Sequence, residues 1–389
     1  MKKLALSTLS LALLGAAGAA HAQSSVTLYG VIDTSIAWVH GNDGQANNSW
    51  QMLSGNLQGS RFGLKGAEDL GGGLKAIFQL ENGFDPGTGK LGQSPSGTSR
   101  IFGRQAFVGL DSKQYGTLTL GRQYDPLVDL VQAVTADNYF GSVMATPGDV
   151  DNNDNSLRVS NAIKYTSPVF AGFQVEGMYA LGGVAGKTGA GQTWSVAAAY
   201  NNGPVGVAAG YFYANNPSPT TTPVRGGWGS TTSDNIIDGP INSGYATAKS
   251  IAIAQVAGQY AIGPVTFGLG YSNAQYKPDA FSGFGSTEKY NTGRAFVTYQ
   301  VTPPLLLGLG YSYTKASGDT SAKYHQVGVG ADYSLSKRTD IYLVGAYQHA
   351  SGTQLVDGVQ QSAQASIASY GFAGKSSAEM VALGIRHKF

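Results

Sequence analysis

An alternation of apolar residues with small or polar ones runs along almost the whole chain, and it constrains the fold more than any other feature. In the segment 264–273 the large apolar residues occupy every second position, and the residues between them are Gly, Thr or Ser. The segments 194–200 and 305–314 show a similar alternation. Successive side chains of a β-strand point to opposite faces, so a period of two residues indicates strands rather than helices. The sequence therefore predicts an all-β chain.

The alternating segments also suit a membrane-spanning barrel. No run of about 18 apolar residues follows residue 22, so the sequence predicts no transmembrane helix beyond that point. A closed barrel crosses a membrane with strands, because it pairs every backbone group within the sheet. Such a barrel needs alternating segments of about 10 residues separated by turns. Charged residues make up only 12% of the chain, about half the usual share, which fits a protein with a large lipid-facing surface.

Short turns and long polar connections follow one another between the segments. The short turns, each with Gly, Pro, Asn or Asp, lie at 68–73, 111–115, 167–172, 201–204, 261–264, 301–304 and 334–340. The long connections lie at 39–57, 82–99, 124–156, 182–191, 214–247, 277–288 and 350–375, with a shorter one at 316–320. This order predicts a 16-stranded antiparallel transmembrane β-barrel with eight outer loops. The rival folds are a soluble β-sandwich and a propeller, which rarely keep all their short turns on one side.

The first 22 residues have the composition of a secretory signal. Lys2 and Lys3 precede an apolar stretch, and Ala20-His21-Ala22 forms a small-x-small cleavage site. We therefore expect residues 1–22 to be a signal peptide and residues 23–389 to form the barrel. Loss of the two lysines lowers the basic count from 25 to 23, equal to the 23 acidic residues. A neutral chain lacks the basic surface that nucleic-acid binding needs, so we expect no nucleic-acid partner.

The last segment alternates up to a C-terminal phenylalanine. Val381, Leu383 and Ile385 share a face with Phe389, and Arg386 and Lys388 lie on the other face. A cation facing lipid near the midplane costs about 2–4 kcal/mol, so these two cations should face the lumen or lie at the interface. An open strand edge is not tolerated in lipid, so this segment should pair with the first strand, at 26–38.

Several sequence motifs resemble those of the general porins of Gram-negative outer membranes, most closely the β-proteobacterial ones. The motifs are SVTLYGVID at 25–33, SRFGLKGAEDLGGGLKA at 60–76, FGRQAFVGL at 102–110, GTLTLGRQY at 116–124, NSLRVSNAIKY at 155–165, LSKRT at 335–339 and GIRHKF at 384–389. They span nearly the whole chain in the order that the family has. The resemblance implies a homotrimer of water-filled barrels in the outer membrane, in contact with lipid and lipopolysaccharide. Each barrel would let small hydrophilic solutes and ions diffuse through it.

The resemblance also implies that the third outer loop, here about 125–155, folds inward and narrows the pore. Asn138-Tyr-Phe-Gly141 occupies the region where the family's loop tip often has Pro-Glu-Phe-Gly. The glutamate is absent, so Asp137 is the first candidate for the acid at the tip and Asp129 the second. Asp125 at the start of the loop is a further acidic candidate.

The arginines Arg61, Arg104 and Arg158 match the basic wall cluster of the resembling family. Strand alternation agrees for the first, because outward Phe62 and Leu64 leave Arg61 and Lys65 inward. For the second we expect Phe107 outward, and Arg104, Ala106 and Val108 inward. We predict that Arg61, Arg104, Arg158 and Lys65 form one side of a pore constriction with mild anion preference, facing Asp125, Asp129 and Asp137. The alternative is that the arginines neutralise wall carboxylates such as Glu81 or Asp33. Arg122 also matches the family, and its role could lie at a subunit contact.

Other chemical motifs do not make a convincing site. Ser334-Leu-Ser-Lys337 and Ser233-Asp-Asn235 match β-lactamase elements, but in reversed order and outside a helix start. Asp149, Asp151 and Asn153 begin like a calcium loop that then lacks its Gly and closing Glu. No nucleophile elbow or histidine ligand spacing occurs, and the absence of Cys excludes thiol chemistry. We therefore expect no enzyme, cofactor or metal, and weigh a barrel phospholipase or protease, or an adhesin, as the alternatives.

Overall fold

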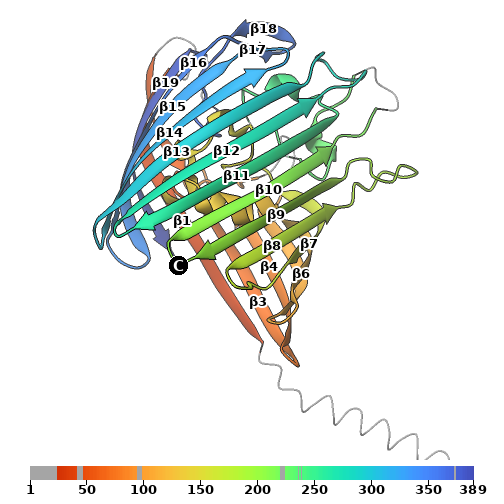
Figure 1. Cartoon of the computed structure of the whole chain (residues 1–389), viewed down its shortest axis with the longest axis vertical. Coiled ribbons are helices and arrows are strands. Elements are labelled where there is room, and N and C mark those ends of the chain that lie inside the picture. The colour runs from red at the N-terminus through yellow and green to blue at the C-terminus, as the bar shows by residue number, and fades with distance from the viewer. Residues whose placement is uncertain are drawn as a thin grey trace, which may run out of the picture.

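The computed structural model describes residues 24–41, 47–93, 99–219, 224–234, 236–237, 239–371 and 374–389. The predicted signal peptide, 1–22, lies outside the described residues. Among the helices of the described residues, none is long and apolar enough to span a membrane. All the strands except those of one short hairpin form a single antiparallel sheet that curls round on itself into a tilted barrel (Figure 1).

The first half of the barrel wall holds the strands β1 (Ser25–His40), β2 (Asn48–Ser54), β3 (Arg61–Gly71), β4 (Leu74–Gly83), β5 (Gln105–Ser112), β6 (Gly116–Gln123), β7 (Val159–Thr166), β8 (Phe173–Ala180) and β9 (Thr193–Asn202). The second half holds β10 (Val205–Asn215), β11 (Ser250–Ile262), β12 (Val265–Lys277), β13 (Glu288–Thr302), β14 (Leu305–Ser317), β15 (Lys323–Ser334), β16 (Thr339–Ser351) and β19 (Ser377–Lys388). A separate hairpin, β17 (Thr353–Val356) and β18 (Val359–Ser362), lies outside the wall.

The predicted count of sixteen wall strands is confirmed, with one strand broken in two. β2 pairs with the half of β1 that ends at His40, and β3 pairs with the half that begins at Ser25. The two therefore form a single wall strand, interrupted at residues 55–60. The predicted outer loop 39–57 is wrong in its extent, because its residues 48–54 form β2 and only 41–47 connect the strands. The alternation in this segment is limited to Trp50 and Met52, which is too short to separate it from a polar loop.

The barrel closes as the C-terminal pattern predicts. β1 pairs with β19 from Val31 opposite Lys388 to His40 opposite Glu379. At the end of this seam the backbones of Gly30 and Phe389 exchange two hydrogen bonds of 3.0 Å. A Cβ atom at Gly30 would lie 2.3 Å from the Phe389 ring, so a residue without a side chain lets the last aromatic ring cover the seam.

The outer wall is apolar where the alternation places it. Leu269 and Leu383 are 71% and 63% exposed, as expected for side chains that face lipid. One predicted orientation is wrong. Val108 is 56% exposed on the outer wall, and Phe107 lies on the opposite face, paired with Gln79. Arg104 precedes β5, so the alternation of that strand does not set its direction.

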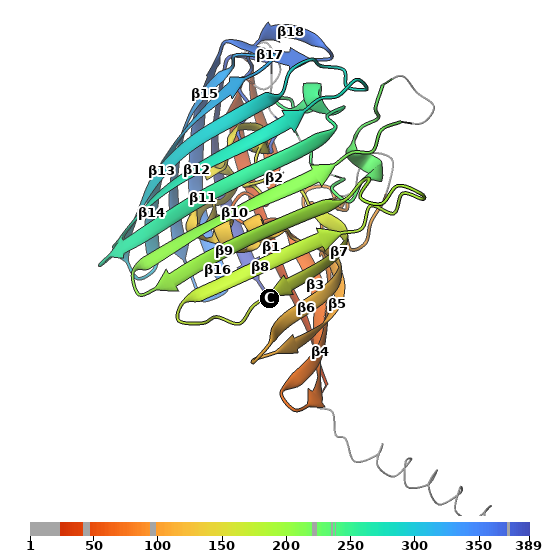
Figure 2. The same ribbon diagram turned by 45° about the vertical axis from the view of Figure 1, so that its right-hand side comes forward.

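The connection between β6 and β7, residues 124–158, folds into the barrel and is called L3 below (Figure 2). Its short helix α2 (Asp137–Phe140) ends in Phe140, which is 1% exposed and packs against the wall. A Cβ atom at Gly308 or Gly330 would lie 2.0 or 2.1 Å from the Phe140 ring. Glycines of β14 and β15 therefore create the space in which L3 is seated.

Polar contacts fix the later part of L3 to the same side of the wall. Asp151 Oδ2 lies 2.5 Å from Arg294 Nη2 of β13 and also accepts a hydrogen bond from Ser272 of β12. Gln255 Nε2 of β11 donates to the carbonyl oxygen of Asp151 at 2.6 Å. Asp151 and Arg294 side chains are 1% and 8% exposed, so this ion pair is shielded from water. L3 is thus held across the lumen rather than over it.

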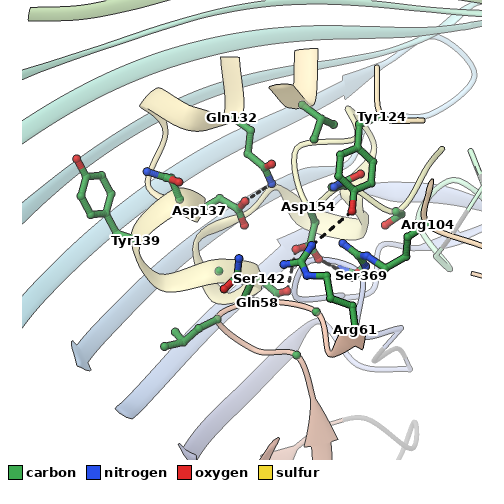
Figure 3. A pocket seen from close by; sticks show the side chains of 18 of the residues that line it. Gln58, Arg61, Arg104, Tyr124, Gln132, Asp137, Tyr139, Ser142, Asp154 and Ser369 are labelled. Carbon is green, nitrogen blue, oxygen red and sulfur yellow. Dashed lines mark hydrogen bonds between the residues drawn. The ribbon is translucent and has the colours of Figure 1, made fainter. Parts of the chain in front are cut away.

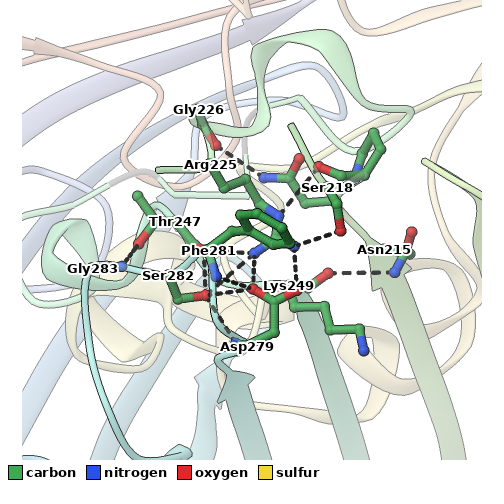
Figure 4. A network of polar contacts seen from close by, with 12 residues as sticks. Asn215, Ser218, Arg225, Gly226, Thr247, Lys249, Asp279, Phe281, Ser282 and Gly283 are labelled. Carbon is green, nitrogen blue, oxygen red and sulfur yellow. Dashed lines mark hydrogen bonds and ion pairs between the residues drawn. The ribbon is translucent and has the colours of Figure 1, made fainter. Parts of the chain in front are cut away.

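Two other long connections reach L3. We call residues 216–249, between β10 and β11, L5, and residues 352–376, between β16 and β19, L8. Ile241 of L5 lies against Gly148 of L3, and Gly148 N donates to the Ser366 oxygen of L8 at 3.1 Å. L5 also contacts the β12–β13 connection. Arg225 of L5 donates two hydrogen bonds, of 2.8 and 2.6 Å, to the carboxylate of Asp279 in that connection (Figure 4). L3, L5 and L8 are therefore connected to one another by direct contacts.

Candidate functional site: the narrow part of the lumen

A cavity of 1080 Å³ lies between L3, L8 and the wall around β3 and β19 (Figure 3). Its charged lining consists of the cations Arg61, Arg104, Arg158, Arg386 and Lys388 and the acids Asp129, Asp137, Asp154 and Asp332. The three arginines predicted for the constriction are thus brought together in one cavity. Arg386 and Lys388 face the lumen, as the alternation of the last strand predicts.

Arg61 and Arg104 share one wall carboxylate. Arg104 Nε donates to Glu81 Oε1 at 3.0 Å, and Arg61 Nη1 lies 3.9 Å from the same oxygen. The alternative interpretation, that the arginines neutralise Glu81, therefore applies to part of the cluster. Asp33 takes no part in it, because it accepts hydrogen bonds from the backbone amides of Leu57 and Gln58.

Tyr124, at the start of L3, is the centre of the cluster. The guanidinium carbons of Arg104 and Arg158 lie 5.6 and 5.2 Å from the centre of its ring. Its hydroxyl donates to Glu81 Oε1 at 2.8 Å and accepts from Arg61 Nη1 at 3.4 Å. Cation–π contacts favour a fixed guanidinium position, so one ring holds the cations in place. The sequence motif that ends at Tyr124 marked the start of the loop but not this role.

Arg158 is the least compensated of the three cations. It is 3% exposed, and its Nη1 donates to the Ser156 oxygen at 2.9 Å. Within the described part of the chain it has no carboxylate within ion-pair distance, and its Nε has no hydrogen-bond partner. Burial and the neighbouring Arg104 lower the pKa of Arg158 to about 9, which leaves it protonated at neutral pH. The cluster therefore carries more positive charge than Glu81 offsets.

The predicted acids separate into two groups. Asp129 lines the cavity and forms an ion pair with Lys164 of β7, and Asp137 lines it with one carboxylate oxygen held by Gln132. Burial and the nearby Asp154 raise the pKa of Asp137 well above its usual value. Asp125 does not line the cavity. It is fully buried and accepts from Leu127 N and Asn152 Nδ2, both at 2.9 Å, so it shapes the turn into L3.

Lys65 also lies apart from the cavity. Its ammonium lies 5.2 Å from the centre of the Tyr29 ring, on the same inner face of β3 as Arg61 but nearer the β3–β4 turn. The cation that continues the basic wall is instead Lys388, because Arg61 and Lys388 both pair with Val31, from opposite sides.

Residues of L8 and of the end of L3 complete the cavity. Asp154 accepts from Ser142 Oγ at 2.7 Å and from the side chain of Ser369. Tyr370 lies beside it and donates to Asn56 Oδ1 at 2.8 Å. Sequence reasoning missed these residues, because L8 has no alternation and Asp154 was one acid among several.

The carboxylates of the segment that begins like a calcium loop accept hydrogen bonds and ion pairs from protein groups. Asp149 accepts from Asp154 N at 2.7 Å and from Ser156 Oγ at 2.6 Å, and Asp151 pairs with Arg294. Arg122 is buried as well and reaches Asp234 of L5 at 3.2 Å. Over the residues that the structure describes, no cluster of three or more His, Cys, Asp or Glu side chains is arranged to hold a metal ion.

Comparisons with known proteins agree with this fold. The family model described as Gram-negative porin matches residues 7–353. An outer membrane porin protein of Bordetella pertussis is 31% identical over the full length of both chains, and the outer membrane porin protein 32 of Delftia acidovorans is 35% identical over 54% of this chain and 59% of its own. Among solved structures, the anion-selective porin from Comamonas acidovorans superposes with a TM-score of 0.69 at 24% identity, covering 94% of this chain and 100% of its own, and shows the same fold. The chain therefore belongs to the family of Gram-negative porins and forms a channel in the outer membrane.

Proposed function

We propose that this porin is a passive diffusion channel for small hydrophilic solutes and ions with a mild preference for anions. The observation that carries the proposal is the convergence of Arg61, Arg104 and Arg158 on one cavity, in which Glu81 is the shared carboxylate partner of Arg61 and Arg104. Pores sort ions by diameter, by lining groups and by fixed charges, and no catalytic step is needed. The fold neighbour from Comamonas acidovorans, which is named an anion-selective porin, supports the direction of the preference.

The size of the effect follows from Coulomb's law. Two unit charges 10 Å apart interact by about 0.4 kcal/mol in bulk water and by about 1.7 kcal/mol at an effective dielectric of about 20. A field of this size biases the traffic of ions without holding any of them tightly. Asp129 and Asp137 line the same cavity as the arginines, so we expect the field between the two signs of charge to favour polar solutes that can orient in it.

The proposal includes assembly as a homotrimer surrounded by outer-membrane lipid and lipopolysaccharide. It is supported by the resemblance to trimeric general porins and by exposed apolar side chains on the outer wall of β1 and β2, where Ile36 and Trp50 are 61% and 73% exposed. Native mass spectrometry in detergent should give three chains per particle, and a stable monomer would contradict this part.

The channel itself is tested by solute uptake into liposomes that contain the purified protein. We expect swelling rates that fall steeply as the neutral sugar becomes larger, with no substrate turnover. A barrel enzyme or an adhesin predicts liposomes that stay closed to all sugars, which would overturn the proposal.

The anion preference should decrease as the pH rises. Burial and Asp154 raise the pKa of Asp137, so this carboxyl is neutral at lower pH and becomes negative as the pH passes its pKa. The new negative charge opposes anions in the cavity. Reversal potentials in a salt gradient should therefore move toward cations between acidic and alkaline pH, and this movement should be smaller in Asp137→Asn. An identical pH profile in the variant would show that another group titrates.

A further inference from the structure

The segment that interrupts the second wall strand borders the lumen. Residues 55–60, called the sill below, separate β2 from β3, and Gly55, Leu57, Gln58 and Gly59 line the cavity. A continuous strand would have kept these residues in the wall. The sill therefore borders the lumen from wall strands other than β14 and β15, on which L3 is seated.

One buried carboxylate organises the sill. Asp33 of β1 is fully buried, and its Oδ2 accepts from Leu57 N at 2.8 Å and from Gln58 N at 2.7 Å. Its backbone oxygen accepts from Gly55 N at 2.9 Å and from Ser60 Oγ at 2.9 Å. An interrupted strand loses the partners of its backbone amides, and buried amides without partners are costly. Asp33 supplies those partners.

The tip of L3 lies directly on the sill. Ser142 N donates to the Asn56 oxygen at 3.0 Å, and Figure 3 shows Ser142 beside the ribbon that bears Gln58. Gly141 has φ of +62°, and a Cβ atom there would lie 1.9 Å from the Asn56 oxygen and 2.7 Å from Leu57 Cα. Only glycine allows this approach of the two backbones. From L8, Tyr370 donates to the side chain of Asn56, so a third segment covers the same joint.

The sill also borders the basic cluster. A Cβ atom at Gly59 would lie 3.0 Å from Arg104 Nη1. The joint between L3 and the sill thus closes one side of the lumen, and the remaining passage runs past Arg61, Arg104 and Arg158.

We infer that the sill, held by Asp33 and sealed by Gly141 of L3, directs solutes past the arginine cluster, and that Asp33 is a positioning residue of the constriction. The inference rests on the proposed diffusion channel and adds a second boundary to it, made by the wall instead of by L3. Its consequence is that the exclusion size for neutral solutes depends on the seal, independently of the charges of the arginines.

Gly141→Ala tests the seal, which is the close contact between Gly141 of L3 and the sill backbone. Gly203→Ala is the matched control. Gly203 also has a positive φ, +56°, in the β9–β10 turn and has open space around it, so its replacement brings the strain of a positive φ without a collision. In liposomes, Gly141→Ala should admit larger neutral sugars severalfold faster than the wild type, and Gly203→Ala should not. Equal size limits in the two variants would overturn the inference while leaving the channel function intact. Liposomes closed even with the wild type would instead refute the proposed function.

A comparison of Asp33→Asn with Asp33→Ala separates the effect of the hydrogen bonds to the sill from the effect of the carboxylate charge. It also tests the inference if Gly141→Ala does not fold. Asparagine retains an oxygen for the two sill amides and can donate to Tyr342, whose hydroxyl lies 2.5 Å from Asp33 Oδ1. We expect Asp33→Asn to retain the wild-type size limit and Asp33→Ala to raise it, with both giving heat-modifiable barrels in electrophoresis. A raised limit in both variants, or in neither, would contradict the positioning role.

Discussion

Replacing Arg61 and Arg104 together by alanine should move the reversal potential in a salt gradient toward cations. The two side chains place fixed positive charge in the cavity, and Arg158, Arg386 and Lys388 are the cations of its lining that would remain. At about 1.7 kcal/mol for a charge 10 Å away in a medium of dielectric about 20, the loss of one arginine changes the energies of an anion and a cation in opposite directions, and so changes the ratio of their permeabilities by up to about 10²-fold. Salt screening reduces this to a severalfold change. Conductance should rise as well, because two long side chains leave the passage.

Two further variants show whether the charge of the arginines is the cause. Lys65→Ala removes a cation from the same inner face of β3 but outside the cavity, and it should leave the selectivity nearly unchanged. Adding Glu81→Gln to the double variant removes the carboxylate that both arginines share. If the shift disappears in this triple variant, unpaired Glu81 caused it. An unchanged selectivity in the double variant would remove the charge filter from the account.

Replacing Asp151 by alanine should release the later part of L3 and destabilise the barrel. The carboxylate pairs with Arg294 at 2.5 Å and accepts from Thr146 Oγ1 at 2.5 Å, and both members of the ion pair are buried. Removing one member of a buried pair leaves the other charge without compensation and typically costs about 3–5 kcal/mol. We expect a lower unfolding temperature in detergent and, in single-channel records, additional conductance levels from a loop that moves.

Asp279→Ala is the matched control for this prediction. Asp279 forms a close ion pair with buried Arg225, but in the outer loops and away from L3. Its loss should lower the unfolding temperature while the conductance stays single-valued. If neither Asp151→Ala nor Asp279→Ala shows additional conductance levels, the position of L3 does not depend on the ion pair with Arg294. The pair Asp151→Asn with Arg294→Gln should recover much of the stability, because it removes both charges.

The wall of the barrel was largely predictable because its signals are local. Alternation reports which side chains face lipid, and tight turns need Gly, Pro, Asn or Asp, so the sixteen strands and the seven turns follow from short windows of sequence. The pairing of β19 with β1 follows from the physical rule that a barrel in lipid has no edge. The inward direction of Arg61 comes from the same alternation.

The contents of the lumen were less predictable because they depend on contacts between distant segments. Arg104 faces the cavity from a loop, because β5 begins after it and the alternation of that strand does not set its direction. The orientation expected for Phe107 and Val108 was wrong, because an aromatic residue was assigned to the lipid side although Phe107 lies on the inner face. Asp125 was grouped with the pore acids, yet it stabilises the turn into L3 through Asn152. A capping carboxylate and a pore-lining one look alike in a sequence. The segment 48–54 could be recognised as a strand only from its pairing with β1.

The most direct test is the reversal potential of the reconstituted wild-type protein in a tenfold gradient of potassium chloride. A lumen bordered by guanidinium groups and narrowed by L3 predicts a potential displaced toward the equilibrium value for chloride, and a displacement that shrinks as the salt concentration on both sides is raised. A potential at zero, or one displaced toward the value for potassium, would contradict the account.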